Sequence, residues 1–143
     1  MTIRLACLLF AAFGITSCSL PSLTSPECSA AREVVRQYYA LSIGGELADH
    51  PEALARIKAL RADNFSAGPI RSDADPFNFS ITPPSSFHVD DCSNAPNGQI
   101  SENVTVIWRA DGRNLQRKDV VRLALVQDRW LIERIDVGTG PNL

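Results

Sequence analysis

Length, composition and charge already exclude several classes of protein. The chain has 143 residues, enough for one domain and too few for two well-filled cores. Apolar residues make up 45% of it, which argues against a wholly disordered chain. Its 14 Lys and Arg residues nearly balance 16 Asp and Glu residues, giving a net charge of −2. Such a chain lacks the positive field that nucleic-acid binding requires, so we expect no nucleic-acid partner.

The amino-terminal segment, residues 1–17, has the features of a secretory signal peptide. Arg4 supplies its charged start, and residues 5–15 supply an apolar stretch too short to span a bilayer. The following Cys18 completes Ile-Thr-Ser-Cys, which resembles the bacterial lipobox. In that family the signal is cut before the cysteine, which is then acylated, with palmitate among its acyl chains. The alternative is an ordinary cleaved signal beside an incidental cysteine.

The lipobox resemblance implies where the mature protein is held. By similarity to Gram-negative lipoproteins, Ser19 after the cysteine favours the outer membrane, so we expect a lipid anchor on Cys18 that faces the periplasm. Several acyl chains make such anchoring stable, because each buried methylene contributes about 0.8 kcal/mol. Residues 18–25 form a Ser- and Pro-rich tether, and a single domain is expected over residues 26–140.

The cysteines predict one disulfide. Cys7 leaves with the signal peptide and Cys18 carries lipid, so Cys28 and Cys92 remain as a pair in an oxidising compartment. A reactive thiol or a metal ligand is the alternative. Neither has support, because the chain has no Cys-x-x-Cys motif and only 2 His residues.

The first predicted helix follows the tether. Residues 25–27 (Ser-Pro-Glu) combine a capping hydroxyl, an early proline and an acid near the positive end of the helix dipole. Gly44-Gly45 ends the helix. Tyr38 and Tyr39 point in different directions, so either one lines a rim or, as we favour, both pack with hydrogen-bonded phenols. The apolar face is expected to contain Ala31, Val34, Val35, Tyr38 and Leu41.

A second, shorter helix is predicted from Asp49 onward. Asp49 can cap it, and Glu52 lies three residues later, as in a capping box. His50 is interpreted as a surface residue at this helix start. The apolar stripe of this helix is expected to contain Leu54, Ile57 and Leu60.

The stretch from Asp63 to Gly98 is the least regular part of the chain. Prolines interrupt any helix there, at positions 69, 76, 83, 84 and 96. Residues 77–81 and 87–90 alternate apolar and polar side chains, which predicts two short half-buried strands. The rest is expected to form a loop over one end of the sheet.

The last third of the chain, residues 102–137, predicts a three-stranded antiparallel meander. Asp111-Gly112 and Asp128-Arg129 are its two turn signals. A two-residue second turn sets Leu125 opposite Ile132. The polar residues 114–119 do not fix the register of the first hairpin, where a bulge is an open alternative. The residues expected to share a buried face are Val104, Val106 and Trp108 on one strand and Val121, Leu123 and Leu125 on the next.

Two helices, an irregular middle and a closing meander resemble nuclear transport factor 2-like domains. The motifs are Ala-Arg-Glu-Val-Val-Arg-Gln-Tyr-Tyr-Ala-Leu at 31–41 and the ending Val-Gln-Asp-Arg-Trp-Leu-Ile-Glu-Arg-Ile-Asp-Val at 126–137. The resemblance covers roughly residues 28–138 and is to small bacterial lipoproteins that bear such a domain of unknown function. It implies a cone-shaped α+β fold, with amino-terminal helices packed on a curved antiparallel sheet. A cystatin-like helix-on-sheet arrangement shares most of this pattern.

One dense polar cluster, residues 88–92, is a candidate site. On a strand, His88 and Asp90 share a face. Enzymes of the resembled family, which are isomerases, cyclases and dehydratases, place an Asp or His inside the cone. The pair therefore suits either a general base with its orienting acid or two metal ligands. A polar loop with turn hydrogen bonds is the favoured alternative, because two ligands do not make a metal site.

These patterns favour a lipid-anchored envelope protein of non-enzymatic binding or accessory type, with a protein or a small ligand as its partner. The alternative is a cone-fold enzyme that uses His88 and Asp90 for proton transfer. No motif for phosphate binding, zinc hydrolysis or a nucleophilic serine is present, so we expect no cofactor and no metal. Basic residues around the first hairpin form either an edge that binds acidic partners or lipid headgroups, or a solvated face that protects the strand edge: Arg109, Arg113, Arg117 and Lys118.

Overall fold

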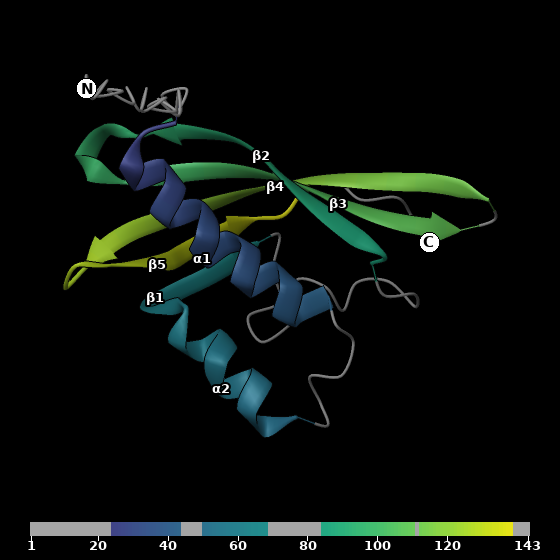
Figure 1. The fold of residues 1–143 in the computed structure, drawn as a ribbon, viewed down its shortest axis with the longest axis horizontal. Helices are drawn as coiled ribbons and strands as arrows, with labels where there is room; N and C mark the ends of the chain where they lie inside the picture. The colour runs from purple at the N-terminus through teal and green to yellow at the C-terminus, as the bar shows by residue number, and fades with distance from the viewer. Residues whose placement is uncertain (1–23, 44–49, 69–83, 111, 139–143) are drawn as a thin grey trace, which may run out of the picture.

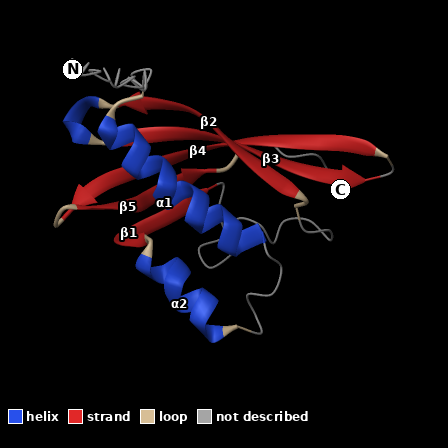
Figure 2. Cartoon of the chain, in the orientation of Figure 1, coloured by secondary structure: helices blue, strands red, loops and turns tan. Residues whose placement is uncertain are grey.

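The computed structural model describes residues 24–43, 50–68, 84–110 and 112–138. It is an α+β fold in which two helices pack on a five-stranded mixed sheet (Figures 1 and 2). The helices are α1 (Pro26–Ile43) and α2 (Pro51–Ala59), and a short 3-10 turn, η1 (Pro96–Gly98), precedes the third strand. The strands are β1 (Arg61–Gly68), β2 (Ser86–Asn94), β3 (Ile100–Ala110), β4 (Arg113–Val126) and β5 (Arg129–Asp136), in the order β1-β5-β4-β3-β2.

The sheet is mixed because its first strand runs parallel to its last. Strands β2, β3, β4 and β5 pair antiparallel in sequence order, so the predicted closing meander is present and β2 extends it. The prediction of a wholly antiparallel sheet is wrong, because β1 pairs parallel with β5. This pairing begins directly at the end of α2, where the Ile132 amide donates to the Leu60 carbonyl at 2.9 Å.

Helix α1 lies across one face of the sheet and forms most of the contact between helices and strands (Figure 1). Its start follows the predicted cap, since the Cys28 amide donates to the Ser25 hydroxyl at 3.2 Å. Tyr38 and Tyr39 both have no exposed surface, so the favoured prediction that both pack is confirmed. The residues that α1 buries are Cys28, Ala31, Val35, Tyr38, Tyr39 and Ser42.

Helix α2 buries less than its sequence predicts. Ile57 is its one buried residue, while Leu54 is 43% exposed, so the expected apolar stripe is wrong at Leu54. The helix contacts mainly α1 and β1, so it buries one narrow face. His50 is the residue before the helix and is exposed, as predicted. The proposed cap Asp49 lies outside the described residues.

The middle of the chain contains more strand than its sequence predicts. Strand β1 falls in a stretch that we expected to be mostly loop. The short strand expected over 87–90 is confirmed as part of β2, which runs from Ser86 to Asn94. The other short strand, expected over 77–81, lies outside the described residues.

The structure fixes the register of the first hairpin, which the sequence left open, and differs from the predicted register of the second. Pairing between β3 and β4 is unbroken from Ile100 opposite Leu123 to the hairpin end, so the open alternative of a bulge there is excluded. The second turn is formed by Gln127 and Asp128, with φ of 50° and 60°, one residue earlier than predicted. Leu125 therefore lies opposite Trp130, and the predicted pairing of Leu125 with Ile132 is wrong.

The sheet has two faces that we name by their relation to α1. The inner face lies under α1 and contains the buried side chains of β3, β4 and β5. The outer face is opposite and contains mainly exposed or half-buried polar side chains. Within the described ranges, neither helix is both long enough and apolar enough to cross a bilayer.

Candidate functional site

The predicted polar pair lies on the outer face, on strand β2. His88 Nε2 is 3.4 Å from Asp90 Oδ1, as expected for two residues that share a strand face. Thr105 on β3 donates from its hydroxyl to Asp90 Oδ2 at 2.7 Å. The His88 side chain is 73% exposed and that of Asp90 is 31% exposed. The pair is therefore open to solvent, and one neighbour orients its carboxylate.

This pair forms part of an open polar hollow on the outer face. The lining side chains offer amide, hydroxyl, carboxylate, imidazole and ammonium groups, and none of them belongs to Phe, Tyr or Trp. Such a surface can form many hydrogen bonds with a polar ligand but cannot exclude water from a reaction. The lining residues are His88, Asp90, Asp91, Asn103, Thr105, Gln116 and Lys118.

A metal centre finds no support at this hollow. In the part of the chain that the structure describes, no three His, Cys, Asp or Glu side chains are close enough to hold a metal ion. Cys92, the last residue of the predicted polar cluster, is joined to Cys28. The pair of His88 and Asp90 is thus brought together as predicted, without a third ligand among the described residues.

The inner face contains a buried polar cluster that we did not predict. Asp119 on β4 has no exposed surface and accepts from Arg117 Nε at 2.8 Å and Nη2 at 2.9 Å. The Tyr39 hydroxyl donates to its Oδ2 at 3.1 Å, and the Gly138 amide donates to its Oδ1 at 3.2 Å. Both carboxylate oxygens therefore have two donors, so Asp119 is a structural acceptor.

The burial of Arg117 differs from what we expected from the sequence. We predicted it as part of a basic edge or a solvated face, but it is 4% exposed and its guanidinium lies 5.1 Å from the centre of the Trp108 ring. Arg109, Arg113 and Lys118 are exposed, as expected. Alternation along β4 would have revealed the difference, because Arg117 and Asp119 have the same parity as the buried Val121.

Burial changes the ionisation of the cluster. Desolvation, together with the charge of Asp119, raises the pKa of the Tyr39 phenol well above its usual range. The phenol is therefore a hydrogen-bond donor at all physiological pH values. It holds the Asp119 carboxylate and is not poised to transfer a proton.

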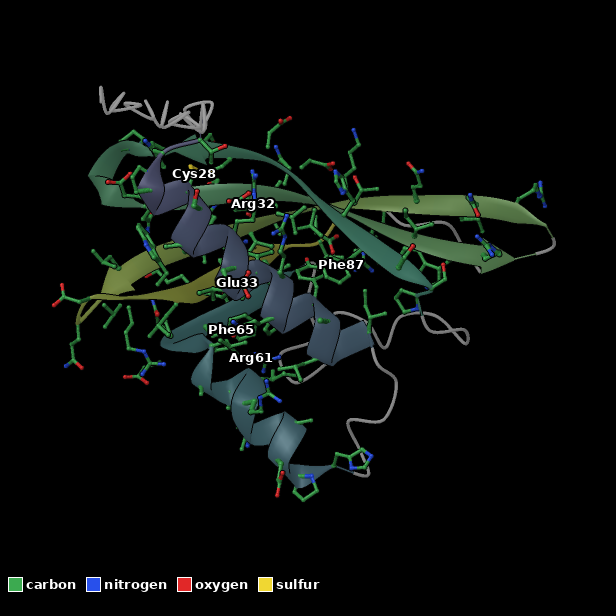
Figure 3. The ribbon with its side chains drawn as sticks, viewed as in Figure 1. Cys28, Arg32, Glu33, Arg61, Phe65 and Phe87 are labelled. Carbon is green, nitrogen blue, oxygen red and sulfur yellow. A yellow bond between two sulfur atoms is a disulfide. The ribbon has the colours of Figure 1, made fainter. Side chains whose placement is uncertain are left out.

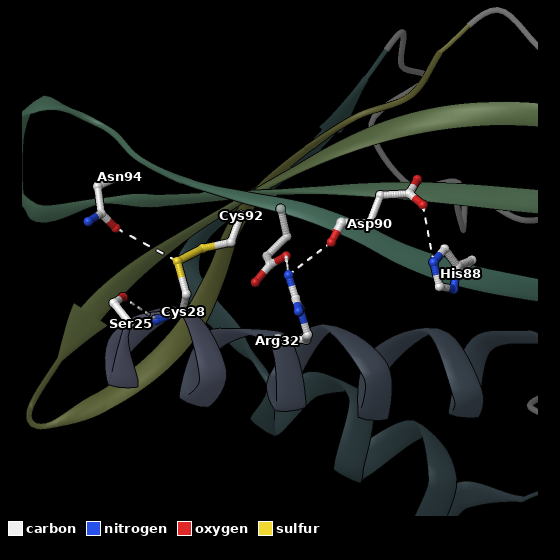
Figure 4. Close-up of polar contacts among 8 residues, drawn as sticks. Ser25, Cys28, Arg32, His88, Asp90, Cys92 and Asn94 are labelled. Carbon is white, nitrogen blue, oxygen red and sulfur yellow. Dashed lines mark hydrogen bonds and ion pairs between the residues drawn. A yellow bond between two sulfur atoms is a disulfide. The ribbon is translucent and has the colours of Figure 1, made fainter. Parts of the chain in front are cut away.

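A second ion pair, between a half-buried arginine and a buried carboxylate, involves the first turns of α1. Glu102 on β3 has no exposed surface, and its Oε2 is 3.5 Å from Arg32 Nη2. The same Arg32 nitrogen donates to the Asp90 carbonyl at 2.9 Å (Figure 4). Glu102 Oε1 and Arg32 Nε are buried without a hydrogen-bond partner. Burial raises the pKa of the Glu102 carboxyl, against the opposing charges of Arg32 and Arg36.

The structure joins Cys28 at the start of α1 to Cys92 on β2 (Figure 4). Their Cα atoms are 6.0 Å apart and 64 positions apart in the sequence. The link holds the first turn of α1 on the sheet, directly beside Glu102, which pairs with Cys92 across the strands. That the bond forms in the exported protein stays a prediction. The proposed lipid attachment site, Cys18, lies outside the described residues.

Aromatic rings fill the space under the second half of α1. The Arg61 guanidinium stacks 4.3 Å from the Phe65 ring centre and donates to the Tyr38 hydroxyl at 2.7 Å (Figure 3). The Tyr39 ring lies 5.6 Å from that of Phe87, and 5.8 Å from that of Tyr38. This arrangement is that of a packed core, because each ring contacts another ring or a cation.

Comparisons with known proteins add no assignment to this geometry. No family model matches the chain, and neither the curated proteins nor the solved structures give a significant match.

Proposed function

We propose that this protein is a lipid-anchored envelope protein of non-enzymatic binding or accessory type. Residues 1–17 act as its signal peptide, Cys18 carries the lipid, and the domain is of the nuclear transport factor 2-like kind. The support for the anchor is Ile-Thr-Ser-Cys directly after an apolar signal. The support for the domain is the pattern of helices followed by a closing meander on one sheet.

The observation that carries the binding role is the open position of His88 and Asp90. A cone-fold enzyme needs this pair in a water-excluding cavity, whereas the imidazole is 73% exposed on the outer face. The fully buried Asp119 is saturated by four donors, so it has no lone pair directed at a substrate. The described polar groups thus suit recognition better than proton transfer.

The outer face is the surface that we propose for binding. Described helices cover the inner face, while the polar hollow and the neighbouring charges of β4 and β5 stay accessible. Arg122 and Asp136 form an ion pair at 3.1 Å beside it, so the surface carries both signs of charge. A polar protein surface of mixed charge is the partner that matches this chemistry.

The anchor is tested by the substitution Cys18→Ser. Loss of the acylated cysteine should move the protein from the membrane fraction to the periplasmic fraction and change its electrophoretic mobility. Fractionation of cells expressing either form measures this. A substituted protein that stays in the membrane fraction with unchanged mobility would contradict the lipoprotein assignment.

The binding surface is tested by site-specific photo-crosslinking in intact cells. A cross-linker at Asn103, in the hollow, should give one discrete product, and Lys118→Glu should remove it by reversing a lining charge. A cross-linker at the exposed Lys58 on α2 is the matched control. His88→Ala should leave the fold intact. Loss of a turnover activity in His88→Ala with an intact fold would favour the enzyme alternative instead.

A further inference from the structure

Exposed apolar side chains gather at one end of the sheet. Of the large apolar residues that the structure describes, Leu125 is 53% and Val126 is 42% exposed, and both end strand β4. Adjacent residues of a strand point to opposite faces, so this hairpin end is apolar on both sides. Leu125 lies opposite the half-buried Trp130, and the half-buried Leu131 follows it on β5. A helix on one face cannot cover such an end.

The start of α1 lies at the same end of the sheet. Cys28 Sγ is 3.9 Å from Asn94 Oδ1. Asn94 pairs with Ile100, and Ile100 pairs with Leu123, so these residues form one row across the strands. Leu125 is two residues beyond that row, or about 7 Å along β4. Figure 1 shows the start of α1 and the β4–β5 turn at the left-hand end of the sheet.

The proposed tether limits how far this end can be from the membrane. From Cys18 to Ser25 the chain has seven residue steps, which span at most about 25 Å when fully extended. An anchored domain therefore meets the lipid surface at a high effective concentration, so a contact that is weak on its own suffices. The charges at the turn, Asp128 and Arg129, have opposite signs, so the contact should be apolar and not electrostatic.

We propose that the end of the β4–β5 hairpin, formed by Leu125, Val126 and Trp130, inserts into the lipid surface to which the protein is anchored. This inference rests on the lipid anchor proposed above. A tryptophan beside an arginine suits the interface, where the ring sits at headgroup depth and the guanidinium stays in water. Because the hairpin is at the end of the strands, the contact leaves the hollow on the outer face outside the lipid.

The experiment uses the full mature lipoprotein, reconstituted in vesicles of zwitterionic phosphatidylcholine that contain brominated chains. The chain has 2 Trp residues, and Trp108 is only 3% exposed. We expect bromine to quench the Trp130 emission, and Trp130→Phe to remove the quenched component. The double variant L125S/V126S should lose most of the quenching, and raised salt should not. Leu54→Ser, at the third exposed large apolar residue, is the matched control and should quench as the wild type does.

The other outcomes each contradict the inference in a distinguishable way. If the protein floats with the vesicles but its Trp130 emission is not quenched, the anchor is present and the hairpin does not insert. The same conclusion follows if quenching in L125S/V126S equals that of the wild type. Concentration-dependent dimerisation that L125S/V126S abolishes, without quenching, assigns the hairpin to a second copy of the chain. Protein that does not float with the vesicles lacks the anchor, which overturns the proposed function as well.

Discussion

Two ion pairs with buried carboxylates on the inner face differ in how completely their hydrogen bonds are formed. Arg117 and Asp119 belong to the same strand and meet through two hydrogen bonds of 2.8 and 2.9 Å. Arg32 and Glu102 belong to α1 and β3 and meet through one contact of 3.5 Å. Both carboxylates are fully buried, so the burial of the carboxylate does not cause the difference.

The origin of each pair explains the difference. Strand geometry places residues i and i+2 on one face, so β4 alone brings the groups of Arg117 and Asp119 together. The second pair depends on where α1 settles on the sheet, and Arg32 also donates to the Asp90 carbonyl. A pair set by local geometry can be saturated, whereas a pair set by the packing of two elements is a compromise among several contacts.

Removal of Asp119 should have the largest effect on stability. Asp119→Ala leaves Arg117 as an unpaired buried charge, so we expect a loss of about 4–5 kcal/mol in the free energy of unfolding. Urea denaturation of the mature protein measures it. Asp136→Asn, at a 31% exposed carboxylate paired with Arg122, is the matched control and should cost less than about 1 kcal/mol. Similar losses of stability in Asp119→Ala and Asp136→Asn would show that the buried pair contributes no more than the exposed one.

If Asp119→Ala yields too little folded protein, a milder substitution tests the same cluster. Tyr39→Phe removes one of the four donors to Asp119 and keeps the ring, so it should cost about 1 kcal/mol. No loss in Tyr39→Phe would show that the buried hydrogen bond contributes nothing.

Loss of the disulfide should have the next largest effect on stability. The bond holds α1 on the sheet, and the pairing of Arg32 with Glu102 depends on the position of α1. Its two cysteines are 64 positions apart, for which the chain-entropy model gives about 4 kcal/mol. The double variant Cys28→Ser/Cys92→Ser should lose up to that amount, and amide exchange should rise in the first turns of α1 before it rises in β4. Mass mapping without reduction is the first measurement, and two free thiols in the exported protein would contradict the bond.

Glu102→Gln should have the smallest effect on stability at neutral pH, but it should clearly change how stability depends on pH. A carboxyl whose folded pKa is raised binds a proton more tightly in the folded state. It therefore lowers stability as the pH rises from its ordinary pKa through the raised one. Gln cannot titrate, so we expect stability at pH 7 within about 1 kcal/mol of the wild type and a flatter profile as the pH rises above about 4.3, the ordinary pKa of Glu.

The profile of Glu102→Gln needs a comparison within the same protein. The wild-type protein, measured in the same buffers over the same pH values, supplies this comparison. An unchanged slope in Glu102→Gln would show that the Glu102 carboxyl titrates normally.

The sequence predicts the elements that local rules define. Ser25 caps α1 as expected, and the β-branched segments of β3, β4 and β5 form the meander. Strand β1 was missed because its buried side chains, Ala62 and Ala67, are small and their spacing is odd, and its pairing with β5 is irregular after Arg61. Period-2 alternation cannot reveal such a strand.

In the candidate site, too, the contacts set by local strand geometry could be predicted, and those set by packing could not. His88 and Asp90 meet as i and i+2 neighbours, which strand geometry predicts. The inward position of Arg117 was missed because its charge was given more weight than the alternation of β4. The Leu125 register was wrong because the turn uses positive φ at Gln127 and Asp128, where sequence gives no glycine signal. Pairing of Arg32 with Glu102 depends on helix placement, which no local pattern contains.

The parallel pairing of β1 with β5 constrains how the domain can fold. Strand β1 is at an edge, and β5 is its only neighbour in the sheet, although β5 is the last strand of the described chain. Loop-closure entropy must therefore be overcome across most of the domain before β1 gains its hydrogen bonds, which slows folding. During synthesis from the amino terminus onward, α2 and β1 emerge before β5 does. Strand β1 has no partner strand until then, and any chain that ends before Arg129 leaves it without one.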